Sequence, residues 1–485
     1  MNTHGACSPS LAELEQGELR GNSAVIFREI AADLDTPVSA FLKIRSGGPA
    51  FLLESVEGGE QLGRYSFIGA DPRSVVRMKD GRIQTNEQAP EPCDDPLIAV
   101  QALVDRYQPA FGPISRFDGG VLGYLSYEAV RYFERVPLAG QDVLGLPDAA
   151  LMDVDTLLIF DHVKHVIRIV SHVWFDQPLP RAYAEAAKRV DDLAERLATP
   201  LPAQSVAHAA AGSWTSNMPR EQFEGIVQRA KEHIVCGDLL QIVLSQRLSL
   251  PYPADPFDLY RRLRRVSPSP YLYFLDFGDH QLVGASPELL VQVEGARVVS
   301  RPIAGTRRRG RSREEDQALE EDLLADTKER AEHLMLVDLA RNDIGRVSVP
   351  GSVQVKRFMK VDLFSHVMHI VSDVEGELRP DCTAYDALRA TFPAGTLSGA
   401  PKVRAMQIIA DLEHDRRGAY GGAVGFINTH GDMEMAITIR TGVVIDGHLH
   451  VQAGAGIVAD SEPANEYEET LNKARALIQV AENAS

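Results

Sequence analysis

The chain has 485 residues, of which 44% are hydrophobic and 24% are charged, and this composition is typical of a folded protein with two domains or one large one. Its formal net charge of −18 disfavours nucleic acid as a partner, because an acidic surface repels phosphate groups. The sequence has no run of about 18 apolar residues, no secretory pattern at its start and only widely spaced cysteines, so we expect no membrane span, no disulfide framework and a cytoplasmic location.

The first part of the chain has the pattern of short strands with a few helices. Apolar or aromatic runs at 51–55 and 64–69 predict strands, and residues 181–197 carry apolar side chains at helical spacing. Residues 198–216 lose this periodicity and are rich in Ala, Pro and Ser, so they are the best candidate for a linker. The expected regions on either side of it are 1–197 and 217–485.

The second region alternates helices and strands and ends in a meander. A helix is predicted from a cap at Ser216 or Asn217 to Cys236, and another over residues 314–341. An Asp-Gly turn at 446–447 is a strong hairpin signal. Further strands and a final helix are expected at 239–250, 423–428, 435–445, 449–453 and 463–481. This mixture predicts an α+β fold, with large antiparallel β-sheets packed as a sandwich and helices outside.

Two pairs of glutamates on the predicted helices are candidates for metal binding. Glu329 and Glu332 are three residues apart, as are Glu466 and Glu469, so each pair shares one helix face. Such carboxylates would supply the hard oxygen ligands that Mg²⁺ prefers. Solvated glutamates are the more common case, so spacing alone leaves both possibilities open.

Two glycine-rich segments, both expected to be loops, could bring backbone amides close to an anion. Residues 452–460 precede the final helix, and residues 393–402 contain Thr396 but lack the spacing of a phosphate-binding P-loop. Alternation within the expected strand 435–445 places Arg440 on one face, where it could bind a carboxylate or point to solvent. His369, in an apolar run, could be an acid or base, or a hydrogen-bonded core residue.

The chain also resembles a known family, and seven blocks in order carry the resemblance. They are RPIAGTRRRG (301–310), KERAEHLMLVDLARNDIGRV (328–347), HVMHIVSDVEGEL (366–378), FPAGTLSGAPKVRAM (392–406), RRGAYGGAVGF (416–426), AITIRTG (436–442) and QAGAGIVADS (452–461). These blocks resemble the chorismate-utilising enzymes, which include anthranilate, aminodeoxychorismate, isochorismate and salicylate synthases. The resemblance is dense over residues 217–480 and looser over 25–175, and it implies the fold of that family.

The resemblance implies a metal site and a catalytic group. Glu332 and Glu469 would hold Mg²⁺ against the ring carboxylate of chorismate, with Glu329 and Glu466 beside them or bridged by water. Glu288 would be the general acid for the departing C4 hydroxyl.

The resemblance also implies further catalytic and substrate-binding residues. His369 would act near this chemistry as a base or an orienting group, and Thr396 would belong to the catalytic set. Tyr420 and Arg440 would bind the enolpyruvyl carboxylate. The remaining substrate contacts would come from Gly305, Thr306 and the backbone amides of Gly454, Ala455 and Gly456.

Two positions distinguish among the members of the family. Aminodeoxychorismate synthases have a lysine nucleophile where this chain has Ala304, and isochorismate and salicylate synthases have a lysine base where it has Gln241. Both departures favour the branch that uses ammonia and releases pyruvate, namely the large subunit of anthranilate synthase. The alternatives are an aminodeoxychorismate synthase component I and a ligand-sensing relative without activity.

The resemblance extends to regulation and to a partner. Ser55, Pro270, Tyr271 and Leu272 resemble elements that bind L-tryptophan as a feedback inhibitor, although Ser267 and Leu272 depart from the common form NPSPYM of the second element. The chain shows no recognisable glutaminase. Ammonia would therefore come from solution or from a separate glutamine amidotransferase subunit, in a hetero-oligomer.

Overall fold

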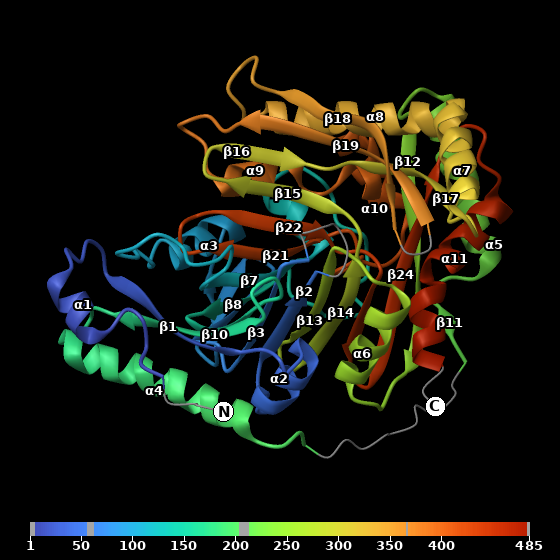
Figure 1. Cartoon of the computed structure of the whole chain (residues 1–485). Helices are drawn as coiled ribbons and strands as arrows, with labels where there is room; N and C mark the ends of the chain where they lie inside the picture. Colours follow the sequence, from blue (N-terminus) through green and yellow to red (C-terminus); the bar gives the residue numbers. More distant parts are fainter. Residues whose placement is uncertain (1–4, 56–62, 203–212, 365–366, 483–485) are drawn as a thin grey trace.

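The computed structural model describes residues 5–55, 63–202, 213–364 and 367–482. It contains two 12-stranded sheets in which every strand pair is antiparallel, packed face to face with helices on the outer sides (Figure 1). The predicted α+β sandwich is therefore confirmed. Between the sheets lies a core of aliphatic and aromatic side chains that includes Phe51, Tyr273, Tyr124 and Phe426.

The first sheet combines strands from the beginning and the end of the chain. In spatial order its strands are β1 (Ser23–Ala31), β10 (Val166–Trp174), β9 (Thr156–Asp161), β3 (Tyr65–Ala70), β2 (Ala50–Glu54), β13 (Tyr271–Asp276), β14 (His280–Ser286), β23 (Thr441–Ile445), β24 (His448–Ile457), β12 (Gln241–Pro251) and β11 (Thr215–Ser216), with β20 (Gly399–Ala400) also paired to β12.

The second sheet has the same mixed origin. Its strands in order are β17 (Ile303–Arg308), β19 (Val367–Glu377), β16 (Arg297–Ser300), β15 (Leu289–Glu294), β22 (Met433–Ile437), β21 (Ala423–Asn428), β7 (Gly120–Leu125), β8 (Ala149–Val154), β4 (Ser74–Lys79), β5 (Arg82–Thr85) and β6 (Glu91–Pro92), with β18 (Gln354–Leu363) paired to β19.

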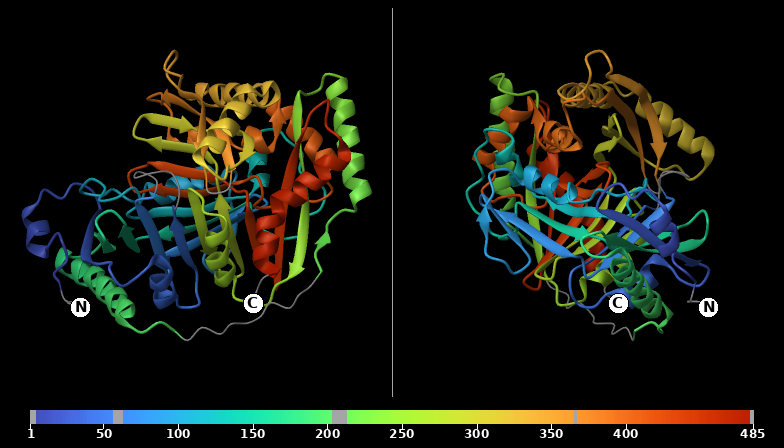
Figure 2. Two further views of the ribbon diagram at one scale, coloured as in Figure 1. Left: turned by 45° about the vertical axis from the view of Figure 1, so that its right-hand side comes forward. Right: turned by 90° about the vertical axis from the view of Figure 1, so that its left-hand side faces the viewer.

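The helices cover the outer faces of the two sheets. They are α1 (Leu11–Gln16), α2 (Pro37–Ile44), α3 (Pro96–Val104), α4 (Leu179–Ala198), α5 (Arg220–Val235), α6 (Pro256–Val266), α7 (Arg313–Ala325), α8 (Thr327–Gly345), α9 (Ala384–Thr391), α10 (Lys402–Leu412) and α11 (Pro463–Glu482), with 3-10 turns η1 (Tyr127–Tyr132) and η2 (Gly395–Leu397). The segment from α7 to β19 forms the top of the molecule in both views of Figure 2. Among the described helices, none is long and apolar enough to span a membrane.

The two regions expected from sequence share both sheets. Strand β2 pairs with β13 in the first sheet, and β7 pairs with β21 in the second, so each sheet joins residues from both sides of the expected linker. Of that linker, residues 203–212 lie outside the described part of the chain, and β11 near its end pairs with β12.

Three sequence-based element predictions were wrong. The helix expected over 314–341 is two helices, because Asp326 leaves helical geometry and its side chain accepts hydrogen bonds from the first backbone amides of α8. Helix α5 begins after Pro219, which has no side-chain cap to offer, and Ser216 forms part of β11 instead. The strand expected over 435–445 is β22 and β23, which belong to different sheets.

Candidate functional site

A cavity of about 720 Å³ lies among β12, β24, β17, β19, α8 and α11. The sequence-predicted residues that line it are Glu288, Gly305, Thr306, Glu329, Glu332, His369, Thr396, Tyr420, Arg440, Gly454, Gly456, Glu466 and Glu469. These residues are spread over nearly 200 positions of sequence, and the fold gathers them around one space large enough for a small organic substrate.

Ala455 is the one predicted substrate-binding residue that does not line this cavity. It is fully buried and packs in a different cluster, with residues such as Phe223 and Ile408. The expected loop at 452–460 is strand β24 as far as Ile457, and successive side chains of a strand point to opposite faces. Gly454 and Gly456 therefore face the cavity, whereas the side chain of Ala455 faces away from it.

The glycines of β24 make room for neighbouring polar groups. A Cβ atom at position 454 would lie 2.6 Å from the Tyr420 hydroxyl, and one at position 456 would lie 2.7 Å from Nε2 of Gln241. Any larger residue would push these groups into the cavity or away from it. The floor of the cavity thus depends on glycine at both positions.

Arg440 reaches the cavity from an unexpected backbone position. It lies in the crossover between β22 and β23, with a φ of +52° in the left-handed region, and not on a strand. The sequence 435–445 was predicted as one strand because the strands on both sides of this crossover are buried and apolar. The guanidinium donates a hydrogen bond to the Lys473 carbonyl on α11, and burial lowers the pKa of Arg440. A buried arginine facing a cavity is suited to bind a carboxylate.

Glu288 is buried at the cavity wall, with 7% of its surface exposed. The Thr396 hydroxyl donates a hydrogen bond of 3.2 Å to its Oε1 atom. Burial raises the pKa of Glu288 from 4.5 to about 8, against a smaller lowering by Thr396. At neutral pH this carboxyl therefore carries a proton, which is the form that a general acid requires.

His369 is held in one orientation by β17. Its Nδ1 atom lies 2.9 Å from the Gly305 carbonyl and 3.0 Å from Oγ1 of Thr306. A carbonyl only accepts, so Nδ1 carries the proton, and burial lowers the pKa of the ring. Nε2 is then unprotonated and can accept a proton, which suits a base.

The two glutamate pairs lie on different walls of the cavity, Glu329 and Glu332 on α8 and Glu466 and Glu469 on α11. Burial raises the pKa of Glu329 and of Glu466, and the negative charge of the neighbouring glutamate adds to each shift. Within the described residues, no group of three or more His, Cys, Asp or Glu side chains is close enough to hold a metal by itself.

The donor set nevertheless suits a hard divalent cation. Two carboxylate pairs face one cavity, and a cation between them would relieve their mutual repulsion. The Nε2 atom of Gln241 donates to Glu332 at 3.5 Å, while its buried Oε1 atom has no hydrogen-bond partner in the described chain. That oxygen is free to accept a hydrogen bond from a bound molecule.

Sequence reasoning missed five polar residues of the cavity. They are Lys328, Gln452, Ser461, Asn472 and Lys473. Lys473 forms an ion pair of 2.7 Å with Glu469 and donates to the Gly454 carbonyl at 3.0 Å. Its position one helical turn after Glu469 was a signal that could have revealed it.

A second, smaller cavity of about 70 Å³ lies between the two sheets. It is lined by strands β2 and β13 of the first sheet and β21 and β22 of the second. Ser55, Pro270, Tyr271 and Leu272 all line it, because the pairing of β2 with β13 brings these distant segments together. Arg116 and Glu434 give it a positive and a negative group.

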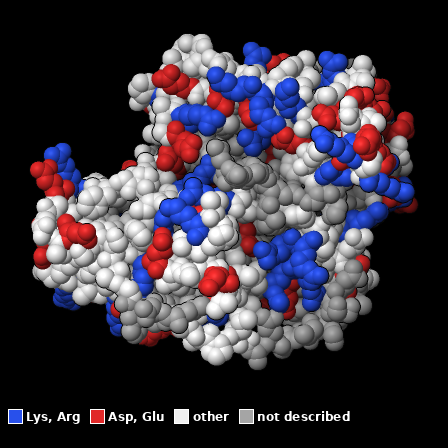
Figure 3. Space-filling view, in the orientation of Figure 1, with Lys and Arg blue, Asp and Glu red and all other residues white. Residues whose placement is uncertain are grey.

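The surface carries both signs of charge. In Figure 3 acidic and basic side chains are interspersed over the upper part of this face. The arginine-rich segment 307–313 is largely paired within the protein, since Arg307 binds Asp322, Arg308 binds Glu315 and Arg309 binds Asp316.

The model of the chorismate binding enzyme family matches residues 48–479, and the chain therefore belongs to this family. Among curated relatives, anthranilate synthase component 1 of Pseudomonas aeruginosa is 48% identical over 93% of this chain and 94% of its own length. That of Aquifex aeolicus is 46% identical over 98% of both chains. These relatives confirm the branch of the family that the sequence resembled.

Solved structures agree with this placement. Anthranilate synthase component I from Streptococcus pneumoniae superposes with a TM-score of 0.79 at 39% identity, covering 92% of this chain and 98% of its own. The isochorismate synthase MenF of Escherichia coli shares the fold, with a TM-score of 0.73 at 17% identity over 97% of this chain and 98% of its own.

Proposed function

We propose that this protein converts chorismate and ammonia into anthranilate, pyruvate and water. The observation that carries the proposal is the shared cavity, in which a protonated, buried Glu288 faces the same space as Arg440 and the two glutamate pairs. The curated relatives named anthranilate synthase component 1 support the same reaction.

Substrate binding follows from the charges of the cavity. Chorismate carries two carboxylates, and Arg440 with Tyr420 offers donors for the one on the enolpyruvyl group. The glutamate pairs would hold Mg²⁺, which when bound would attract the ring carboxylate and withdraw electrons from the ring. A ring carboxylate held between α8 and α11 would fix which end of the substrate faces Glu288.

The first chemical step is amination. The nitrogen lone pair of ammonia forms a bond to C2, the ring double bonds shift, and the C4–O bond breaks. Glu288 donates its proton to the departing hydroxyl, which leaves as water. The new ammonium group at C2 gives up a proton to solvent, from which Glu288 is protonated again. Hydroxide is a poor leaving group, so the proton from Glu288 is needed, and a positioned acid typically contributes about 10²- to 10⁴-fold in rate.

The second step is elimination. A base removes the proton at C2, the bond from C3 to the enolpyruvyl oxygen breaks, and the released enolate takes up a proton on its methylene carbon to become pyruvate. The ring becomes aromatic, which drives this step. We assign the base to His369, whose unprotonated Nε2 atom supports the role.

Regulation and supply of ammonia are part of the proposal. The small inter-sheet cavity supports L-tryptophan as a feedback inhibitor, because it offers aromatic walls and two charged groups. Glu434 would bind the ammonium group and Arg116 the carboxylate of the amino acid, in place of their ion pair of 3.3 Å with each other. The description of the relatives as component 1 supports a second subunit. We propose that this subunit is a glutamine amidotransferase and that the two form a cytoplasmic hetero-oligomer.

The proposal is tested with the purified chain, chorismate, Mg²⁺ and ammonium at alkaline pH, with anthranilate fluorescence as the readout. We expect fluorescence that grows with ammonium and requires Mg²⁺. An aminodeoxychorismate synthase would give no fluorescence without a further lyase, and Ala304 argues against the covalent lysine route of that enzyme. Absence of any product from chorismate would overturn the proposal.

A further inference from the structure

A buried ion pair lies directly behind the wall of the large cavity. Arg417 and Glu413 have side chains that are 1% and 3% exposed, and they belong to the segment between α10 and β21. Nε of Arg417 donates to one carboxylate oxygen of Glu413 at 2.8 Å, and Nη2 donates to the other at 2.7 Å. Two charges this deeply buried are tolerated only when their remaining hydrogen-bonding groups are also paired.

The other donors of Arg417 hold the backbone of the cavity wall. Nη1 donates to the Leu397 carbonyl and Nη2 to the Val243 carbonyl, both at 2.7 Å. Leu397 and Val243 both line the cavity, and Leu397 directly follows Thr396, the partner of Glu288. The guanidinium also lies 5.7 Å from the centre of the Tyr420 ring.

Glu413 extends the same network from β12 to strand β24. Its Oε1 atom accepts hydrogen bonds from the Ser245 amide at 2.7 Å and from the Ser245 hydroxyl at 3.0 Å. The hydroxyl in turn accepts from Nε2 of Gln452 at 2.8 Å, and Gln452 lines the cavity on β24. One ion pair therefore holds four cavity residues, which lie on β12, η2, β24 and the loop before β21.

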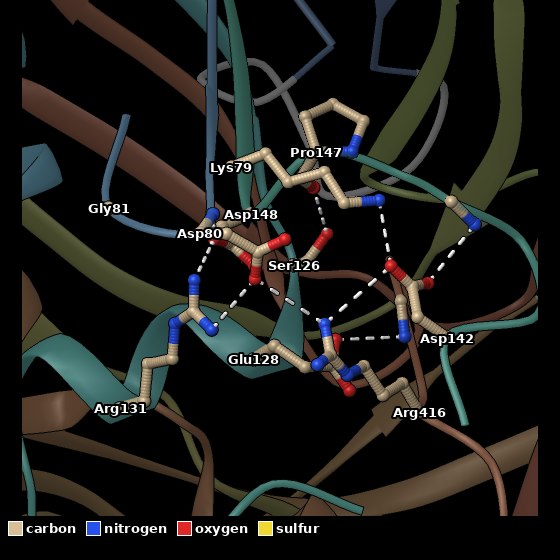
Figure 4. A network of polar contacts seen from close by, with 12 residues as sticks. Lys79, Asp80, Gly81, Ser126, Glu128, Arg131, Asp142, Pro147, Asp148 and Arg416 are labelled. Atoms are coloured by element: carbon tan, nitrogen blue, oxygen red, sulfur yellow. Dashed lines mark hydrogen bonds and ion pairs between the residues drawn. The ribbon is translucent and has the colours of Figure 1, made fainter. Parts of the chain in front are cut away.

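The same segment is fixed from behind by the N-terminal region. The Glu128 carboxylate, in η1, accepts from the backbone amides of Arg417 at 2.7 Å and of Gly418 at 3.0 Å. The side chain of the preceding residue, Arg416, points toward Asp142 and Asp80 (Figure 4). Its Nη1 atom lies 3.6 Å from Oδ2 of Asp142 and 3.7 Å from Oδ1 of Asp80. The ion pair is thus held rigidly between the two halves of the sequence.

We infer that Arg417 and Glu413 are positioning residues for the reaction: without touching substrate, they fix Tyr420 and the Thr396 segment relative to each other. A guanidinium is suited to this task because its five donors lie in one rigid plane. The inference rests on the proposed function, since turnover of chorismate is what reveals the displacement.

The substitution Arg417→Lys tests this inference. Lysine keeps the positive charge, but a single Nζ atom cannot bind both Glu413 oxygens and both carbonyls. We expect the KM for chorismate to rise by about tenfold, and the high-pH limb of kcat to move, because Tyr420 and the Thr396 contact to Glu288 are displaced. The control is Arg28→Lys, on edge strand β1, where Arg28 pairs with Asp191 at 2.6 Å. This substitution should lower the melting temperature but change neither the KM nor the pH dependence of kcat.

A second variant tests the positioning role if Arg417→Lys does not fold. Ser245→Ala removes only the hydroxyl that joins Glu413 to Gln452, and it leaves both charges paired. We expect a several-fold rise in the KM for chorismate with little change in melting temperature. The inference would be overturned if folded Arg417→Lys protein had the wild-type KM and pH profile, or, where that variant does not fold, if Ser245→Ala did. An inactive wild type in the same assay would instead overturn the proposed function.

Discussion

The Thr396 hydroxyl and the Glu288 carboxyl lie 3.2 Å apart, and they come from segments more than 100 residues distant in sequence. Burial raises the pKa of Glu288 by more than the Thr396 hydroxyl, which donates to Oε1, lowers it. Burial keeps the carboxyl protonated at neutral pH. We therefore expect the activity to depend on the protonated form of Glu288, whose pKa is raised by burial.

Glu288→Gln preserves the shape of the side chain but removes its acidic proton. We expect kcat for anthranilate formation to fall by about 10²- to 10⁴-fold, while the dissociation constant of chorismate changes little. Steady-state kinetics and calorimetric titration measure the two quantities. Glu294→Gln, which alters an exposed carboxylate on β15, is the control and should match the wild type.

The pH dependence of turnover follows from the raised pKa of Glu288, about 8. The active form is protonated, so kcat should be full below this value and decline as the pH rises through it. The measurement holds the concentration of free ammonia constant, so that the nucleophile does not contribute to the profile. A kcat that stays level to pH 10 would remove Glu288 from the role of acid.

Glu469→Gln tests the metal site. The substitution removes one negative charge from α11, so we expect Mg²⁺ to bind at least about tenfold more weakly. The shift of the melting temperature with added Mg²⁺ reports this without any turnover. The neighbouring Glu468→Gln, where an exposed side chain pairs with Arg220, should leave the Mg²⁺ response unchanged.

Gly454→Ala tests the fit of the cavity floor. The added methyl group would lie 2.6 Å from the Tyr420 hydroxyl and 2.8 Å from the Leu244 carbonyl, so one of them must move. We expect the KM for chorismate to rise by about tenfold or more. Gly225→Ala on α5, where a Cβ atom meets nothing within 4 Å, should retain the wild-type KM and gain slightly in stability.

Tryptophan and chorismate should oppose each other's binding. We expect saturating L-tryptophan to raise the dissociation constant of chorismate, and chorismate to raise that of tryptophan by the same factor, because linkage is reciprocal. Ser55→Phe fills part of the inter-sheet cavity and should weaken the tryptophan effect, measured relative to the activity of each protein without tryptophan. Unchanged chorismate affinity in saturating tryptophan would contradict the regulatory assignment.

Several features were predictable from local sequence. The final helix and the Asp446-Gly447 hairpin appear as expected, because caps, turns and periodicity act over a few residues. The residue blocks shared with the family contain many of the cavity residues, although Glu288, Glu466 and Glu469 lie outside them. The interpretation of residues 452–460 as a loop was wrong as far as Ile457, because the glycines of this run lie in a paired strand.

What the sequence determined by itself was the chemistry available: two pairs of glutamates, an arginine, a histidine and a row of glycines at fixed intervals. Only the tertiary structure decided that Arg440 sits in a crossover between sheets, that β2 meets β13, and that Glu288 keeps its proton. Each of these depends on strand pairing and burial between segments far apart in the chain, and neither quantity is encoded in any local window of residues.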